Sequence, residues 1–444
     1  MTVRGLLDPF RLPLLILLAA TFPLRAHAQG WPAPIPSDSL ATLERTPPDV
    51  RGTLTLEEAL RLALRLNPAI AESVWIARAA THRASDEARL LNPTLDGTEE
   101  NFGLGLGSGH RETTVSGSQT LEISGARGAR ARVASSLARV ADAELDSRER
   151  EVLLATAEAF LDAWSLERRL RLLRRSEDIA SATVAAAKER TRVGAAPPTE
   201  GLRAQGVVAQ QSVERRLVEA DLAEARRRLA LQWGAREAAF DSLALPPTTV
   251  PRLPPATELL ADLERHPERL QAAAETAVEA ARIRQARAMR IPDLTVSGGV
   301  RHLQEFGESG FVAGVSLPLP LWNSHGALVR AAEADHNAAV ARETGVRLRL
   351  EQELLSAYDR LLAARDRFET ARTELEPTAR EALDQLQRGY RAGRFTYLDQ
   401  LDGQRAAVEA ELLTLQTERE TWSARIALEA LLGRSLESVS EGRR

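Results

Sequence analysis

The stretch RGYRAGRFTYLDQLDGQR, residues 388–405, decides the fold, because it interrupts two long helical patterns with one short turn. Gly393 supplies the conformational freedom that a sharp helix end requires. Thr396 is a suitable cap for the next helix, and Asp399 and Asp402 lie three residues apart on one face of it. The stretch therefore predicts a long helical hairpin with two carboxylates just past its turn.

A second copy of this turn lies earlier in the chain, in RTRVGAAPPT, where Gly194 precedes Gly393 by 199 residues. The same offset relates three further pairs of marks: Asn67-Pro68 with His266-Pro267, Pro93 with Pro292, and Gly234 with Gly433. A constant offset over this distance indicates an internal duplication. We expect repeat 1 at 54–235, a Pro-rich linker at 236–257 and repeat 2 at 258–433.

Each repeat has the same order of expected elements: a first helix, two strands and two long helices. In repeat 1 the strands fall at about 94–102 and 112–124, and the long helices at about 127–193 and 199–234. In repeat 2 the strands fall at about 294–303 and 309–321, and the long helices at about 327–392 and 396–432. Pro377 is expected to kink the third long helix. The fold class is therefore mainly α with a small β part, and the long helices need neighbouring helices to cover their apolar stripes.

The expected strands alternate between two kinds of side chain. In SGFVAGVSLPLPL the odd-numbered positions from Phe311 to Leu321 are apolar or small, as in strands of a transmembrane β-barrel. A soluble hairpin half-buried against a helix gives the same alternation. Four strands cannot close a barrel, and open strand edges are not tolerated in lipid. A membrane location would thus require several chains to associate, and three chains would give a closed 12-stranded barrel above a tube of twelve long helices.

The two ends of the chain and its composition limit the function. Arg4 and Arg11, an apolar run at 12–24 and Ala26-His27-Ala28 predict a signal peptide at 1–28, followed by a linker at 29–53; residues 434–444 form a tail. The absence of cysteine excludes disulfides, zinc–thiolate sites and a lipidated N-terminal cysteine. The net charge of −4 gives no support for nucleic-acid binding.

No motif predicts an enzyme, a cofactor or a metal site. Nucleophile motifs, phosphate loops and HExxH are missing from the sequence. His336 follows Asp335 on an expected helix without a second histidine at i+4, and His110 fits a solvated loop residue. Two non-enzymatic alternatives remain, a periplasmic coiled-coil adaptor and a soluble helical scaffold, but neither accounts for both the duplication and the paired strands.

The segments LTLEEALRLALRLNPAI, ENFG and QTLEISGARGAR, together with the two turns, resemble the TolC-like outer-membrane efflux proteins, and most of all the CzcC-like heavy-metal-efflux branch. This resemblance implies a homotrimer with a β-barrel in the outer membrane and an α-helical barrel in the periplasm of a Gram-negative cell. It also implies a periplasmic adaptor and an inner-membrane pump of the resistance-nodulation-division type as partners. The expected function is a passive exit duct for metal cations, with organic drugs or another small molecule as the alternative.

The resemblance also implies roles for the residues of the two turns. Asp399 and Asp402, with Glu200 from repeat 1, would line the periplasmic aperture, where clustered carboxylates attract cations. Repeat 1 departs from the acidic pair, because Arg203 stands where Asp402 would be and Pro197 where Thr396 would be. The expected adaptor-docking tip consists of Val193, Gly194, Thr199, Gly393, Arg394 and Thr396.

Overall fold

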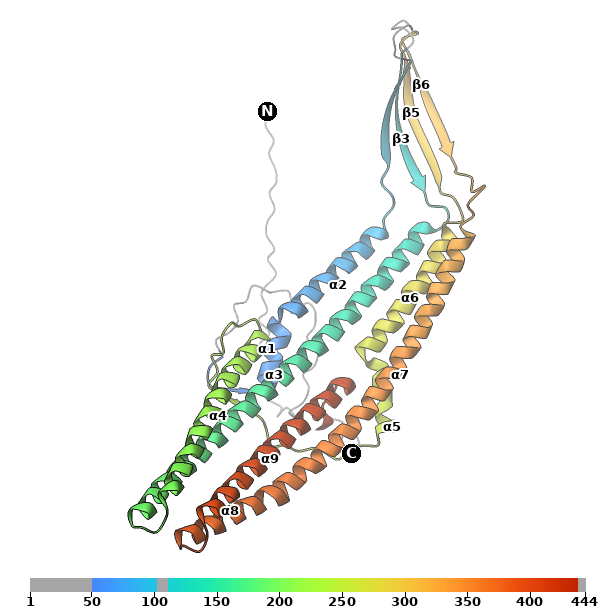
Figure 1. Cartoon of the computed structure of the whole chain (residues 1–444). Helices are drawn as coiled ribbons and strands as arrows, with labels where there is room; N and C mark the ends of the chain where they lie inside the picture. Colours follow the sequence, from blue (N-terminus) through green and yellow to red (C-terminus); the bar gives the residue numbers. More distant parts are fainter. Residues whose placement is uncertain (1–49, 102–110, 438–444) are drawn as a thin grey trace, which may run out of the picture.

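The computed structural model describes residues 50–101 and 111–437. These residues form an elongated molecule with a four-stranded sheet at one end and two helical turns at the other (Figure 1). The predicted signal peptide, most of the linker at 29–53, His110 and the tail after residue 437 lie outside the described residues. Within the described residues, no helix is both long enough and apolar enough to cross a membrane.

The described residues of repeat 1 form the expected helices and strands in the expected order, preceded by one short strand. They are β1 (Thr53–Thr55), α1 (Leu56–Leu66), α2 (Pro68–Glu87), β2 (Thr94–Glu100), β3 (Glu112–Leu121), α3 (Ala126–Arg192) and α4 (Pro198–Leu231). Thr55 and Glu58 form a capping box at the start of α1. The first helix is split at Asn67, because Pro68 has no N–H to continue the helical bonding and instead begins α2.

Repeat 2 follows a connection that includes β4 (Ser242–Ala244), which pairs in parallel with β1. Its elements are α5 (Ala256–Leu259), the 3₁₀ helix η3 (Leu260–Arg265), α6 (Pro267–Ala288), β5 (Leu294–Leu303), β6 (Glu308–Ser316), α7 (Gly326–Thr370), the π-helical turn η4 (Ala371–Leu375), α8 (Glu376–Arg391) and α9 (Tyr397–Leu432). The helices α2, α3, α6 and α7 lead to the sheet, and α3, α4, α8 and α9 lead to the two turns (Figure 1).

The expected single helix at 327–392 is wrong in one respect, because η4 interrupts it. The N–H of Glu376 donates to the carbonyl of Ala371, five residues back, which widens this turn. Pro377 follows directly and has no N–H to donate to residue 373, so the α-helical ladder cannot run through unchanged. Thr414 of α9 donates its hydroxyl to the Ala371 carbonyl at 3.4 Å. The kink predicted from Pro377 is therefore a π turn, supported from the partner helix.

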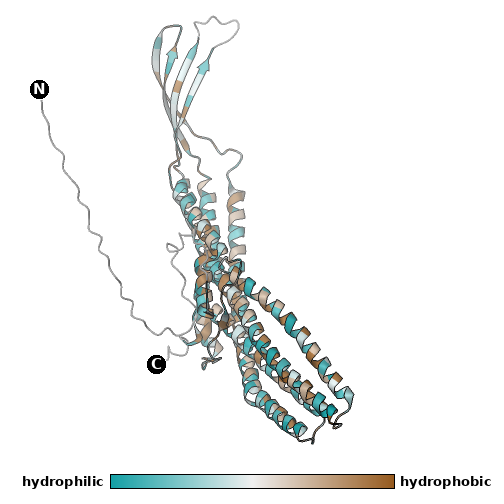
Figure 2. Cartoon of the chain, turned by 90° about the vertical axis from the view of Figure 1, so that its left-hand side faces the viewer, coloured by the Kyte–Doolittle hydropathy of each residue, from teal (hydrophilic) through white to brown (hydrophobic). Residues whose placement is uncertain are grey.

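The sheet has the order β2-β3-β5-β6, and all its pairings are antiparallel. Val115, Val300 and Phe311 lie side by side across three strands, and the sheet carries both hydrophobic and hydrophilic residues (Figure 2). Phe311 is 95% exposed, so this apolar face is uncovered in the single chain. The edge strands β2 and β6 have no outer partner among the described residues.

Two expected strands end earlier than their sequence patterns suggested. The strand predicted at 309–321 stops at Ser316, since Pro318 and Pro320 cannot donate to a ladder. The strand predicted at 112–124 stops at Leu121, because the chain turns there and Glu122 pairs with Arg130 of α3 at 2.8 Å. For the strand predicted at 94–102, β2 ends at Glu100, and residue 102 lies outside the described residues.

Helix α3 holds the molecule together, because it packs against α2, α4, α6 and α9. Two apolar clusters lie in the middle of the molecule, and the first of them includes residues of α3. One contains Phe160, Leu229 and Trp233 from repeat 1 with Phe240 from the linker, and the other contains Leu259, Leu354, Leu361 and Leu428 from repeat 2. The predicted class, mainly α with a small β part in two repeats, is confirmed.

Candidate functional site: the paired helical turns

The turns that end α3 and α8 have the same backbone geometry. Gly194 has φ of 74° and Gly393 has φ of 73°, a region that favours glycine. One residue later, the N–H of Ala195 donates to the Arg190 carbonyl at 2.8 Å, and the N–H of Arg394 donates to the Gly389 carbonyl at the same distance. Both helices thus end in the hydrogen-bonding pattern of a Schellman motif.

After the repeat 2 turn, the carboxylate of Asp399 forms hydrogen bonds with the residue that caps the same helix, Thr396. It accepts from the Thr396 N–H at 2.8 Å and from the Thr396 hydroxyl at 2.7 Å, and the Asp399 N–H donates back to that hydroxyl at 3.2 Å. These bonds from Thr396 lower the pKa of Asp399. Asp399 and Asp402 both remain exposed to solvent. The turn therefore presents two charged carboxylates at the end of the molecule.

After the repeat 1 turn, Glu200 faces the other hairpin. It accepts from the Tyr390 hydroxyl at 2.5 Å, and Arg190 lies 3.9 Å from it. The Arg190 guanidinium stacks 4.7 Å from the centre of the Tyr390 ring and donates to the Tyr390 carbonyl at 3.1 Å. The Glu200 side chain is only 11% exposed. We call Arg190, Glu200 and Tyr390 the tip clasp, because they join the two hairpins near their turns.

An apolar cluster lies beside the tip clasp and comes from both repeats. Tyr397 meets Tyr390 edge-on, with ring centres 6.5 Å apart. Further along the same contact, Gln400 donates to Thr183 at 3.2 Å. The cluster consists of Ala187, Ala204, Tyr390, Tyr397 and Leu401. Burial and the bond to Glu200 raise the pKa of Tyr390 above its usual value, so its hydroxyl stays protonated and donates.

The sequence-based prediction included Glu200 but missed Arg190, Tyr390 and Tyr397. A signal for the tyrosines was present, because the chain has only three and two of them flank the repeat 2 turn. Asp399 and Asp402 lie together on α9, whereas Glu200 lies in the contact between the hairpins. The carboxylates expected at one aperture thus occupy two different environments.

The six residues expected at the docking tip are all exposed at the far end of the molecule (Figure 1). Large apolar side chains are exposed next to both turns, among them Val193 at 59%, Leu398 at 50% and Phe395 at 43%. Phe395 was not predicted, and it covers Gly389, where an added Cβ would lie 2.2 Å from its ring. Among the described residues, no group of three or more histidine, aspartate or glutamate side chains is placed to hold a metal ion.

Comparison with known proteins agrees with this architecture. The family model described as "Outer membrane efflux protein" matches residues 59–235 and 261–434, which correspond to the two repeats. The chain is 28% identical over 389 residues to the cobalt-zinc-cadmium resistance protein CzcC of Cupriavidus metallidurans, covering 87% of this chain and 92% of that protein. It is 31% identical over 302 residues to the nickel and cobalt resistance protein CnrC of the same organism, covering 65% and 69%.

A solved structure of CusC, from work on its folding and transmembrane channel formation, superposes with a TM-score of 0.74 at 15% identity, covering 92% of this chain and 99% of that one. At this identity the superposition establishes the fold, which is that of the outer-membrane channels. The family match spans both repeats and so most of the chain. The chain belongs to the outer membrane efflux protein family, and it is an outer-membrane protein that serves in efflux.

Proposed function

We propose that three copies of this chain form the exit duct of a tripartite system that exports metal cations. The observation that carries the metal assignment is the similarity to CzcC, whose name records cobalt, zinc and cadmium resistance and which aligns over 92% of its length. A periplasmic adaptor would dock on the exposed tip, and an inner-membrane pump of the resistance-nodulation-division type would drive transport. The duct itself would be passive.

The trimer is supported by the edges of the sheet and by uncovered helix faces. A sheet with free edges at β2 and β6 is not tolerated in lipid, whereas three sheets of four strands close a barrel. The apolar row that includes Phe311 would then face outer-membrane lipid. On α4, Leu202, Val213 and Leu217 are each more than 60% exposed, as expected of a face that a second copy covers. A native mass of one chain for the detergent-extracted protein would contradict this proposal.

The metal assignment is tested in the cell that carries the gene. Deleting the gene should sensitise cells to cobalt, zinc, cadmium or nickel, and the wild-type gene should restore growth. The control is a panel of organic toxicants, including dyes and detergents, at matched growth inhibition. Sensitivity to the organic panel alone, with unchanged metal tolerance, would assign the duct to organic substrates instead.

For the periplasmic aperture, we propose that Asp399 and Asp402 form an acidic ring and that Glu200 sets its width through the tip clasp. Three copies would bring six exposed carboxylates together, which favours cations. Replacing both aspartates with alanine should lower the cation preference of channels in planar bilayers, and block by multivalent cations should weaken. Glu381→Ala, an exposed change on α8, is the control. Unchanged selectivity in the double variant would leave the two carboxylates with a role in helix capping only.

A further inference from the structure

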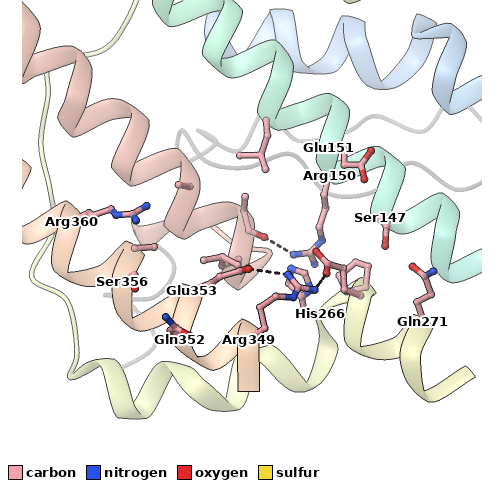
Figure 3. Close-up of a pocket in the computed structure, with 17 residues that line it drawn as sticks. Ser147, Arg150, Glu151, His266, Gln271, Arg349, Gln352, Glu353, Ser356 and Arg360 are labelled. Carbon is pink, nitrogen blue, oxygen red and sulfur yellow. Dashed lines mark hydrogen bonds and ion pairs between the residues drawn. The ribbon is translucent and has the colours of Figure 1, made fainter. Parts of the chain in front are cut away.

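A cavity of about 800 Å³ lies in the middle of the molecule, between α3, α6, α7 and α9 (Figure 3). The charged groups that line it are matched in number, three guanidinium groups and three carboxylates: Arg150, Arg349, Arg360, Glu151, Glu268 and Glu353. Arg349 forms ion pairs with two of these carboxylates, those of Glu268 and Glu353. The charges that face this cavity are therefore compensated within the chain, whereas apolar surface beside the sheet is uncovered.

The two repeats connect the sheet to their long helices in different ways. In repeat 1, β3 ends at Leu121 and α3 begins at Ala126, which leaves residues 122–125 as the connection. In repeat 2, β6 ends at Ser316 and α7 begins at Gly326. We call the longer connection between them, residues 317–325 with the sequence LPLPLWNSH, the sheet connector. Figure 1 shows it bending outward to the side before α7 begins.

The repeat 1 connection is held by polar contacts with its neighbours. Glu122 forms an ion pair with Arg130 of α3 at 2.8 Å, and the Glu122 side chain is only 4% exposed. The Ser124 hydroxyl donates to Asp293, just before β5, at 3.3 Å, and it accepts from the Ala126 N–H at 3.2 Å. This connection is therefore fixed to α3 and to the segment that enters β5.

The sheet connector is apolar and exposed instead. Its large apolar side chains have exposed fractions of 45%, 65%, 71% and 94% in the order Leu317, Leu319, Leu321 and Trp322. Among the described residues, the hydrogen bonds that it forms before α7 are internal. The Leu321 N–H donates to the Leu319 carbonyl at 2.9 Å, and the His325 N–H donates to the Asn323 side chain at 3.0 Å. Because so much contiguous apolar surface is unfavourable in water, a partner outside the single chain is needed to cover it.

The sheet connector continues the apolar row of β6, to which Phe311 and Val315 belong. Leu317 and Leu319 each precede a proline, which restricts them to extended conformations. In an extended chain every second side chain lies on the same side. Leu317 and Leu319 therefore lie on the side of Phe311 and Val315. The row that the proposed barrel turns toward lipid thus extends beyond its last strand.

The length of β6 places the sheet connector at the edge of the hydrocarbon layer. The strand runs from Glu308 to Ser316 and contains nine residues. At about 3.3 Å per residue and a tilt of about 40°, it rises about 23 Å, close to the apolar band of about 25 Å in outer-membrane barrels. The residues after Ser316 therefore fall at the level of the lipid headgroups. Trp322 suits this level, since its ring is apolar and its N–H can donate.

We propose that the sheet connector is a membrane-surface anchor, which places Leu319, Leu321 and Trp322 in the phospholipid layer on the helical side of the outer membrane. This inference rests on the proposed barrel, and it adds a lipid-binding segment that repeat 2 alone contributes. Pro318 and Pro320 suit such a segment, because they have no N–H groups that would need a partner in lipid. In the trimer, three anchors around the base of the barrel would fix its depth in the membrane.

The test uses the full chain reconstituted into phosphatidylcholine vesicles whose acyl chains are either plain or brominated, because bromine quenches the fluorescence of a tryptophan that it contacts. Trp322→Phe gives the fluorescence of Trp322 by difference. Trp75→Phe, at an exposed tryptophan on α2, is the matched control. Brominated lipid should quench the Trp322 fluorescence, and bromine near the headgroups should quench it more than bromine near the bilayer centre. The Trp75 fluorescence should not change with the lipid.

A charged substitution tests whether the apolar side chains hold the connector in the membrane. Leu319→Asp should reduce the quenching of Trp322 by brominated lipid, because a carboxylate is unfavourable in an apolar layer. Asn323→Asp adds the same charge next to Trp322 but removes no apolar side chain, so most of the quenching should remain.

Channel recordings from the same preparations separate this inference from the proposed function. If channels form but lipid quenches Trp322 no more than Trp75, the anchor is wrong, the proposed duct is unaffected and a neighbouring copy covers the connector. If the protein neither inserts nor forms channels, both the duct and the anchor are contradicted. Quenching at the wild-type level in both Leu319→Asp and Asn323→Asp would also overturn the anchor.

Discussion

The repeat 1 turn and the repeat 2 turn have the same backbone conformation, but their side chains make different contacts. Gly194 and Gly393 differ by 1° in φ, and the same hydrogen bonds close both helix ends. Their acids differ in what they contact, since Glu200 binds Tyr390 of the other hairpin while Asp399 caps its own helix. Duplication thus preserved what the backbone requires, a glycine with positive φ, and left the side chains free to diverge.

From this difference we infer that the repeat 1 turn holds the two hairpins together and that the repeat 2 turn presents charged side chains to solvent. Arg190 occupies the position that corresponds to Gly389, and Ala196 the position that corresponds to Phe395. In repeat 1 the small Ala196 leaves Arg190 free to reach Tyr390, whereas in repeat 2 Phe395 folds over the bare Gly389. Four predictions test this division, and the expected effects decrease in order.

The largest effect is expected from Tyr390→Phe, which removes the hydroxyl bond to Glu200 but keeps the ring. A hydrogen bond to a charged group contributes about 1.5–3 kcal/mol. Because the tip clasp joins the two hairpins, we expect its loss to shift the equilibrium between joined and separated hairpins by about 10–150-fold toward separation. Single-channel recordings should show a longer open time and a larger mean conductance.

Tyr358→Phe is the matched control for this change, because Tyr358 lies on α7, packs against the repeat 2 cluster and is far from the turns in the chain. It should leave the conductance unchanged. Equal recordings from the two variants would show that the tip clasp does not restrain the hairpins, and the comparison of the turns would then be one of local structure only.

The second prediction concerns the close contact that only repeat 2 contains. In Gly389→Ala the new methyl group would lie 2.2 Å from the Phe395 ring, so the ring must move and about 1–3 kcal/mol of stability is lost. Gly345→Ala on α7 has open space around it and should gain about 0.5–1 kcal/mol from helix propensity. Thermal melts of both proteins give the comparison; a stabilising Gly389→Ala would mean that Phe395 is not packed there.

Part of this division could be predicted from the sequence, because it depends on neighbouring residues. Gly393, the Thr396 cap and the place of Asp399 in the first turn follow from local rules that span only a few positions. The kink at Pro377 was also predictable, although its form as a π turn depends on the partner helix α9. Local chemistry thus determines where the helices end.

The remainder depends on contacts between residues far apart in the chain. Glu200 and Tyr390 are separated by 190 residues, and their contact requires the register of two hairpins that meet through α3 and α9. Strand ends were overestimated for a related reason. Apolar alternation continues past Ser316, but the ladder stops where the prolines remove its donors.

The third prediction compares the caps of the two turns. Thr396→Ala removes a side chain that bonds to the Asp399 N–H, and loss of such a cap costs about 0.5–2 kcal/mol. Pro197→Ala changes the corresponding position, where no side chain caps α4, so no hydrogen bond is lost. Melting temperatures should fall for the first variant and change little for the second. An equal fall in melting temperature for both variants would mean that the Thr396 side chain does not stabilise the turn through its bond to Asp399.

The smallest effect is expected from Asp399→Asn, and it should depend on pH. The bonds from Thr396 hold the folded pKa of Asp399 below its ordinary value. For an acid with a lowered folded pKa, the stabilising contribution is present above the unfolded pKa and is lost as pH falls through the folded pKa. Hydrogen exchange of the peptide that spans the repeat 2 turn, corrected for intrinsic rates, should therefore show weaker protection in the variant at pH 7. The difference should begin to shrink as pH falls below the ordinary pKa of aspartate, about 3.9, and should disappear only below the lower folded pKa of Asp399. The repeat 1 turn, where Pro197 provides no side-chain cap, should show no such difference between the two proteins at either pH.

Because the new amide oxygen can still accept from Thr396, only the charge is removed, and the effect should be smaller than that of Thr396→Ala. A difference that persists unchanged in acid would mean that the Asp399 charge plays no part in the cap.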